Sequence, residues 1–311
     1  MRRTIAAFGR SLVTVGILIL LFVGYQLWGT GFLTARAQND LEDELDGLRR
    51  QVAEQTTTST GPTPTTEPGG PTTTTTAPDL SKLPRIGEGD PVGRIVIEAI
   101  GVDWVFVQGT SRDDLKKGPG HFPATPMPGQ NGNAAIAGHR TTYGAPFHRL
   151  DELRPGDTIV TETLAGRYEY RVRELLVVRP SEIGVVANTP DPQLTLTTCN
   201  PKYSARERLV VKADLVVENS DEPTDESPVI IDDDFADDEV AAGLEEGLSG
   251  DPVSRSPTVL WGAITLLVGL AWWFAYRRFR HPLTWFAGAV PFLPVLFTFY
   301  VFLERVLPAG Y

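Results

Sequence analysis

The chain has 311 residues, enough for one or two domains, and a formal net charge of −11. Its single cysteine excludes an internal disulfide framework. The negative charge is local: residues 218–251 hold 14 Asp and Glu and no Lys or Arg, so the rest of the chain carries +3. Acidic stretches with few aromatic residues are typical of solvated, disordered linkers. The acidic balance therefore does not favour nucleic-acid binding, and we expect no nucleic-acid partner.

Three uncharged stretches, 11–35, 256–276 and 282–303, are each long enough to cross about 30 Å of hydrocarbon as a helix. The first follows three arginines, as a signal peptide would. It is longer than the usual apolar region of about 7–15 residues, and no small-residue cleavage site closes it. We therefore interpret it as an uncleaved membrane anchor.

Basic residues predict the orientation of these spans. The basic N-terminus and the short loop 277–281, which contains three arginines, both indicate the cytoplasmic side. The two signals agree on a multi-pass plasma-membrane protein whose central region is extracellular. We expect five regions: a cytoplasmic N-terminus and anchor (1–37), a charged helix and stalk (38–82), a globular domain (83–218), an acidic disordered linker (219–255), and two transmembrane helices with a short basic cytoplasmic loop (256–311).

The segment between anchor and domain has two parts. Residues 39–55 are charged and contain regularly spaced leucines, which predicts a short exposed helix or a weak coiled coil. Residues 56–78 contain twelve Thr and five Pro, a composition typical of an extended spacer. We expect this stalk to lift the globular domain off the bilayer.

The globular domain has the pattern of a mainly β protein. Ser111 and Asp114 predict a capping box that opens a short helix. Seven or eight strands with little helix predict a closed or nearly closed β-barrel. The expected strands are residues 93–98, 104–107, 133–138, 158–162, 168–178, 193–198 and 209–217.

Cys199 ends the strand-like run 194–198 and precedes Asn200-Pro201, a turn signal. This position predicts a thiol held rigidly at a strand-to-loop junction. A lone exported cysteine is either a reactive thiol or a small buried hydrophobic residue. Considered alone, Cys199 leaves both interpretations open.

A thiol needs a histidine or another cation to become nucleophilic at neutral pH. Of the histidines in the domain, His139 directly follows the strand predicted at 133–138, so the fold can aim it. His121 and His148 lie in loops. Arg206 and Arg208 are candidates for stabilising an oxyanion, with an exposed surface charge as the alternative for both.

These residues resemble a known family, the sortases, and most closely the class E, housekeeping-type sortases of Gram-positive actinobacteria. The resemblance extends over residues 92–217. It rests on TLTTC at 195–199, which fits the TLxTC signature, on AGHR at 137–140, and on RLVV at 208–211. The three segments occur in the order and spacing of the family. The resemblance implies a closed sortase-like barrel of seven to eight strands with short helices.

The resemblance also implies roles for five residues. Cys199 matches the nucleophile, His139 the general acid and base, and Arg208 the arginine that supports the oxyanion and substrate. Thr198 matches the residue whose backbone assists there, and Tyr143 sits where class E members place a substrate-facing tyrosine. The other candidates match no motif, so we expect Arg206 to be a surface charge and His121 and His148 to serve packing.

The implied activity is that of a membrane-anchored cysteine transpeptidase. We expect no cofactor and no metal-ligating residues, and the sequence leaves metal dependence open. The enzyme would cleave a Thr–Gly bond in an LPxTG-like or LAxTG-like sorting signal through a thioacyl intermediate, and join the product to an amine. The implied partners are surface proteins that bear sorting signals, a peptidoglycan precursor or pilin that supplies the amine, and the membrane.

The residues leave two alternatives to this transpeptidase activity. L,D-transpeptidase-like acyltransferases, which act on peptidoglycan stems, carry an S-x-G-C pattern, whereas two threonines precede Cys199. A non-enzymatic cell-surface module would hold an inert thiol and would tolerate Cys199→Ala. Metal-dependent and serine hydrolysis are disfavoured, because the sequence has no HExxH, no paired cysteines and no GxSxG.

Overall fold

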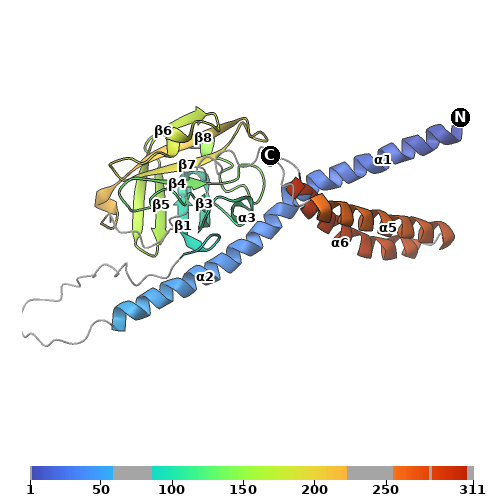
Figure 1. Cartoon of the computed structure of the whole chain (residues 1–311), viewed down its shortest axis with the longest axis horizontal. Helices are drawn as coiled ribbons and strands as arrows, with labels where there is room; N and C mark the ends of the chain where they lie inside the picture. Colours follow the sequence, from blue (N-terminus) through green and yellow to red (C-terminus); the bar gives the residue numbers. More distant parts are fainter. Residues whose placement is uncertain (1, 59–85, 223–254, 280–281, 307–311) are drawn as a thin grey trace, which may run out of the picture. The chain divides into compact units, whose positions relative to one another are not determined.

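The computed structural model describes residues 2–58, 86–222, 255–279 and 282–306 (Figure 1). The chain forms two compact units, one of residues 1–30 with 246–310 and the other of residues 31–245. Most of the Thr/Pro-rich stalk and most of the acidic stretch lie outside the described residues. The predictions made for those two segments, and the division into five regions, stay predictions.

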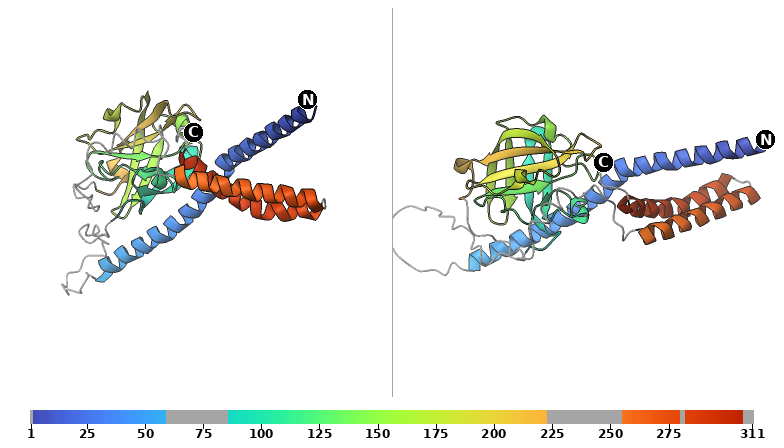
Figure 2. Two further views of the ribbon diagram at one scale, coloured as in Figure 1. Left: turned by 45° about the vertical axis from the view of Figure 1, so that its right-hand side comes forward. Right: turned by 45° about the horizontal axis from the view of Figure 1, so that its top comes forward.

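In the described part of the second unit, eight strands close into a barrel in the order β1-β2-β3-β4-β7-β8-β6-β5 (Figure 2). The pairs β2–β3 and β4–β7 are parallel and the other pairs are antiparallel. The predicted closed β-barrel is therefore confirmed. The strands are β1 (Pro91–Ile97), β2 (Val102–Gln108), β3 (Gly120–His121), β4 (Asn133–Ala137), β5 (Thr158–Thr163), β6 (Arg167–Val178), β7 (Gln193–Asn200) and β8 (Glu207–Leu215).

Short helical segments lie in the connections. The capping box predicted at the start of α3 is present: the Asp114 N–H donates to the Ser111 hydroxyl, and the Ser111 N–H donates to the Asp114 carboxylate. Two orphan donors of the helix start are satisfied in this way. The segments are α3 (Arg112–Leu115) and the 3₁₀ turns η3 (Glu98–Ile100), η4 (Leu150–Glu152), η5 (Ile183–Val186) and η6 (Val217–Asn219).

The strand β4 is buried on both faces, which explains its continuous apolar sequence. Ala134 and Ile136 belong to the main core, which fills the barrel with large side chains such as Phe106, Tyr168 and Tyr170. A second cluster covers the other face of the strand and consists of Phe122, Ala135, Ala137 and Val186. A strand packed on both faces is a rigid support for the residues that follow it.

The helix α2 (Thr30–Thr58) lies along the outside of the barrel (Figures 1 and 2). Leu41 and Leu45 are only 5% and 2% exposed and belong to the main barrel core, and Leu48 packs against it. The helix expected at 39–55 exists, but the expectation that it is exposed was wrong. Its leucines recur every three or four residues, which places them on one face of the helix, and that face packs on the barrel.

Within the described residues, three helices are long and apolar enough to cross a membrane, by length and composition alone: one within Leu12–Glu54, one at Ser256–Phe279 and one at Trp285–Glu304. They coincide with the three uncharged stretches of the sequence. In the first unit, two prolines lie inside α6 without ending it, and Tyr25 packs with Leu296 and Tyr300. The helices of this unit are α1 (Arg2–Gly24), the π-helix η1 (Tyr25–Gly29), α5 (Arg255–Phe279) and α6 (Pro282–Val306).

Candidate active site

The candidate site is built at the C-terminal ends of two neighbouring parallel strands, β4 and β7. The Gly138 N–H donates to the Thr197 carbonyl at 3.0 Å, and the Thr198 hydroxyl donates to the Gly138 carbonyl at 2.7 Å. His139 directly follows Gly138, and Cys199 directly follows Thr198. Because parallel strands advance together, these hydrogen bonds hold His139 and Cys199 at the same end of the barrel.

Arg208 lies on β8, the other strand that pairs with β7, and is at the same end of the barrel. The strand β8 pairs with β7 in antiparallel fashion, and Cys199 and Arg208 are direct partners in that register. The Arg208 side chain is buried, and its Nη1 donates to the carbonyls of Ala205 at 3.0 Å and Glu207 at 3.2 Å. The three residues predicted as nucleophile, base and oxyanion support therefore lie on, or directly after, three adjacent strands.

Cys199 lies one residue before the end of β7, close to the predicted strand-to-loop junction. Its thiol is free and the residue is partly exposed, whereas the preceding Thr197 and Thr198 are buried. The Thr198 hydroxyl is hydrogen-bonded to the Gly138 carbonyl, as described above. A partly exposed thiol on a rigid strand suits a nucleophile better than a packing residue.

His139 is half-buried, and its ring centroid lies 5.0 Å from that of Tyr143 at an interplanar angle of 34°. Burial lowers the pKa of His139 to about 4, and the positive charges of Lys116 and Arg112 add to this lowering. The imidazole is therefore uncharged near pH 7. An uncharged imidazole can accept a proton.

Tyr143 begins a run of backbone in the left-handed region, with φ values of 53° at Tyr143, 71° at Gly144 and 48° at Ala145. Non-glycine residues adopt this region rarely, at a cost of about 1–3 kcal/mol each. The ring of Trp104 packs closely against this segment, since a Cβ at position 144 would come within 2.5 Å of it. Tyr143 itself is largely buried against His139, in the place where a substrate-facing tyrosine was expected.

Arg140 was not singled out from the sequence, although it follows His139 directly. Its side chain is only 3% exposed, and its Nη1 donates to the Cys199 carbonyl at 3.0 Å and to Asn200 Oδ1 at 2.6 Å. Its Nη2 lies 3.1 Å from the Asp151 carboxylate. Its position in the AGHR segment was the sequence signal that could have drawn attention to Arg140. The residues that it contacts could not be predicted in this way, because they lie far along the chain.

The Asp151 carboxylate balances the charge of Arg140. Burial alone would raise the pKa of Asp151, but the positive charges of Arg140 and Lys202 outweigh burial and lower it. On the other side, the carbonyl of Arg140 contacts His148 Nδ1 at 2.8 Å. Arg140 thus joins the backbone of Cys199 to the loop that follows His139.

The remaining candidates are His121 and Arg206. His121 is fully buried, with Nε2 at 2.9 Å from the Pro126 carbonyl, and burial lowers its pKa to about 4. Full burial agrees with the packing role predicted for it. Arg206 is exposed, as expected for a surface charge. In the described residues, no group of three or more His, Cys, Asp or Glu side chains is arranged to hold a metal ion.

Comparison with known proteins identifies relatives of this chain. A family model described as "Sortase domain" matches residues 95–216, which include all the candidate residues. Sortase SrtE1 of Streptomyces coelicolor is 32% identical over 227 residues, 68% of this chain and 57% of that protein. Sortase SrtE2 of the same species is 29% identical over 231 residues, 69% of this chain and 83% of that protein. The matched part of the chain thus spans little more than half of SrtE1.

Among solved structures, sortase E1 from Streptomyces coelicolor with a tripeptide in the active site shares 31% sequence identity. The match covers 41% of this chain and 89% of that chain, with a TM-score of 0.40.

Proposed function

Because this chain belongs to the sortase family, we propose that it is a membrane-anchored cysteine transpeptidase with Cys199 as its nucleophile. The arrangement of β4, β7 and β8 is the observation that supports this most directly. Cys199 carries a partly exposed thiol and pairs with Arg208 in the β7–β8 register, and His139 follows β4 at the same end of the barrel. These are the three kinds of group that acyl transfer through a thioester requires.

In the proposed first step, the uncharged imidazole of His139 accepts the proton of the Cys199 thiol. The thiolate attacks the Thr carbonyl carbon of the Thr–Gly bond in an LPxTG-like or LAxTG-like sorting signal. A carbon–sulfur bond forms, and the carbonyl π electrons move onto oxygen. Arg208 and the backbone at Thr198 support the resulting oxyanion.

In the second step the C–N bond breaks, and the His139 imidazolium gives its proton to the departing glycine amine. An amine of a peptidoglycan precursor or of a pilin then attacks the thioacyl carbon. His139 takes a proton from that amine and returns it to the Cys199 sulfur as the carbon–sulfur bond breaks and the carbonyl re-forms, so that Cys199 leaves as a thiol and a new amide remains. General acid–base assistance of this kind contributes typically about 10²–10⁴-fold to the rate.

The reaction is tested with the full-length protein in detergent or vesicles, supplied with LPxTG and LAxTG peptides and with glycine or a diaminopimelate-type amine. We expect mass spectrometry to detect a product with a new amide bond, and to detect none with Cys199→Ala. Cys199 should also react with a thiol-directed label faster than free cysteine. Failure of both peptides together with ordinary thiol reactivity would contradict the proposal.

We also infer that the barrel lies outside the cell, between the first and second of three membrane spans. The three long apolar helices and the basic residues at the N-terminus and at 277–281 support this topology. It would place the site where surface proteins bearing sorting signals and cell-wall amines are found. A membrane-impermeant maleimide should label Cys199 in intact cells. Labelling only after lysis would overturn the topology.

A further inference from the structure

The start of α2 lies beside the candidate active site. The Thr34 hydroxyl donates to the Lys116 carbonyl at 2.8 Å, and Lys116 is one of the two cations whose charges act on His139. A Cβ placed on Gly31 would come within 3.9 Å of the Gly144 backbone nitrogen. Gly144 directly follows the tyrosine that packs on His139. The start of α2 therefore contacts the segment that carries Lys116 and lies close to the loop that carries Tyr143 and Gly144.

The next turns bind the helix to the barrel wall. The side-chain amide of Gln38 forms two hydrogen bonds of 2.9 Å with the backbone N–H and C=O of Val105 in β2. Leu41 and Leu45 follow and are buried in the barrel core. A bidentate amide contact and two buried leucines leave this part of α2 little freedom to swing away from the barrel.

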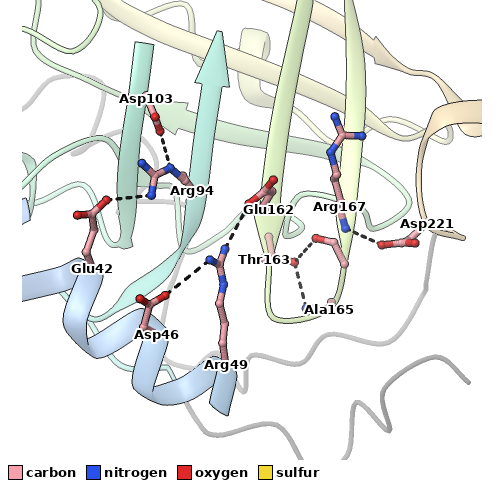
Figure 3. A network of polar contacts seen from close by, with 11 residues as sticks. Glu42, Asp46, Arg49, Arg94, Asp103, Glu162, Thr163, Ala165, Arg167 and Asp221 are labelled. Atoms are coloured by element: carbon pink, nitrogen blue, oxygen red, sulfur yellow. Dashed lines mark hydrogen bonds and ion pairs between the residues drawn. The ribbon is translucent and has the colours of Figure 1, made fainter. Parts of the chain in front are cut away.

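The later turns of α2 reach the opposite end of the barrel. Arg49 lies 3.5 Å from the Glu162 carboxylate of β5 (Figure 3). Glu162 pairs with Arg167, the first residue of β6, whereas the last residue of β6, Val178, pairs with Arg208. The strand β6 therefore runs from the Arg49 end of the barrel to the site. Its 12 residues measure about 36 Å along the strand, at 3.3 Å per residue.

The chain leaves its first apolar stretch at the active-site end of α2. Phe32 and Leu33 are 71% and 37% exposed and end the uncharged run 11–35, which favours contact with hydrocarbon. Gln38 lies five residues after Leu33, about 8 Å further along the helix axis. The barrel is therefore attached where the apolar sequence ends, and its catalytic end is the end nearest to that point.

We propose that α2 holds the catalytic end of the barrel at the membrane surface, so that the site prefers peptide substrates that are themselves tethered to the bilayer. This inference rests on the proposed membrane anchoring and transpeptidase activity. It changes the role predicted for the Thr/Pro-rich segment 56–78. On this proposal, α2 rather than that segment would set the height of the domain.

The orientation is tested with the full-length protein in phosphatidylcholine–phosphatidylglycerol vesicles. One sample carries a fluorophore on Cys199, the only cysteine. The other carries it on Ala165→Cys in a Cys199→Ala background, since Ala165 lies in the turn between β5 and β6 at the opposite end (Figure 3). Lipids with a spin-labelled headgroup should quench the label at 199 several-fold more strongly. Equal quenching, or stronger quenching at 165, would overturn the orientation.

The substrate preference is tested by inserting ten Gly/Ser residues between Leu33 and Thr34, which leaves every contact from Thr34 onward in place. The insertion should weaken quenching at Cys199 and lower turnover of a bilayer-tethered peptide by roughly tenfold, because the effective concentration falls. Turnover of the same peptide free in solution should not change. The matched control is the same insertion between Thr65 and Thr66, which should alter neither readout.

An equal loss on tethered and free peptides, or an equal effect of the control insertion, would overturn the preference. If the unaltered protein cleaves no peptide at all, the proposed function fails, and quenching still decides the orientation.

Discussion

Among single residues, His139, the proposed general base, is expected to set the pH dependence of activity. Its pKa is lowered from the usual 6.5 to about 4, chiefly by burial, so the imidazole stays uncharged well below pH 6. We expect kcat/KM for a sorting-signal peptide to hold down to about pH 5 and to fall as pH approaches 4. An ordinary histidine would lose its base function from pH 6.5 downward. A pH–rate profile distinguishes the two, and His139→Ala should be slower by about 10²–10⁴-fold above pH 5, with a smaller difference as pH approaches 4.

Arg140 is expected to act as a positioning residue for Cys199. Arg140→Lys keeps the charge but loses the planar fork that reaches the Cys199 carbonyl and Asp151 together. We expect kcat to fall by about tenfold or more with little change in KM, and the pH dependence of Cys199 alkylation to shift. Arg149→Lys is the matched control, because Arg149 is exposed and pairs with Glu152. A normal alkylation profile in Arg140→Lys would leave Arg140 a purely structural role.

Among the secondary-structure elements, α2 contributes to the stability of the barrel as well as to its attachment. Leu45 is almost fully buried in the barrel core, so Leu45→Ala should lower the free energy of unfolding by about 2–5 kcal/mol. Glu44→Ala on the exposed face should change it by less than about 0.5 kcal/mol. Urea denaturation of the two variants measures the difference. Equal midpoints would show that the α2 contact contributes nothing to folding.

The strands and the helix were predictable to different degrees because they depend on different ranges of contact. Alternation and turn signals located seven strands, but β3 has only two residues in a Pro/Gly-rich segment and carries no periodic signal. The leucine pattern of α2 predicted a helix and could not identify its partner. Which surface an apolar face meets depends on tertiary contacts, here with strands more than 40 residues away.

The site shows the same limit. Cys199, His139 and Arg208 were identified through motifs, and the strand register brings them together. Arg140 has side-chain partners 11 and 60 residues away, so its role required the folded chain. The left-handed backbone at Tyr143 and Ala145 was equally inaccessible, since neither residue type favours it.

For the molecule as a whole, the buried His121 predicts a dependence of stability on pH. Its pKa is about 4 in the folded barrel and about 6.5 in the unfolded chain, so the unfolded state binds more protons between these values. Titration of His121 therefore leaves the free energy of unfolding unchanged above pH 6.5 and lowers it by about 3 kcal/mol as pH falls toward 4. Melting temperature measured from pH 7 to 4 should fall, and His121→Gln should flatten the fall. An unchanged slope in that variant would contradict this assignment.

The parallel pairing of β4 with β7 also affects how the enzyme matures. The residues that pair are 60 apart in the chain, and contacts between distant segments form late in folding. Before the barrel closes, we expect Cys199 to have neither His139 nor Arg208 nearby and to react as an ordinary thiol. Closure of the barrel would then complete the fold and assemble the proposed site in one event.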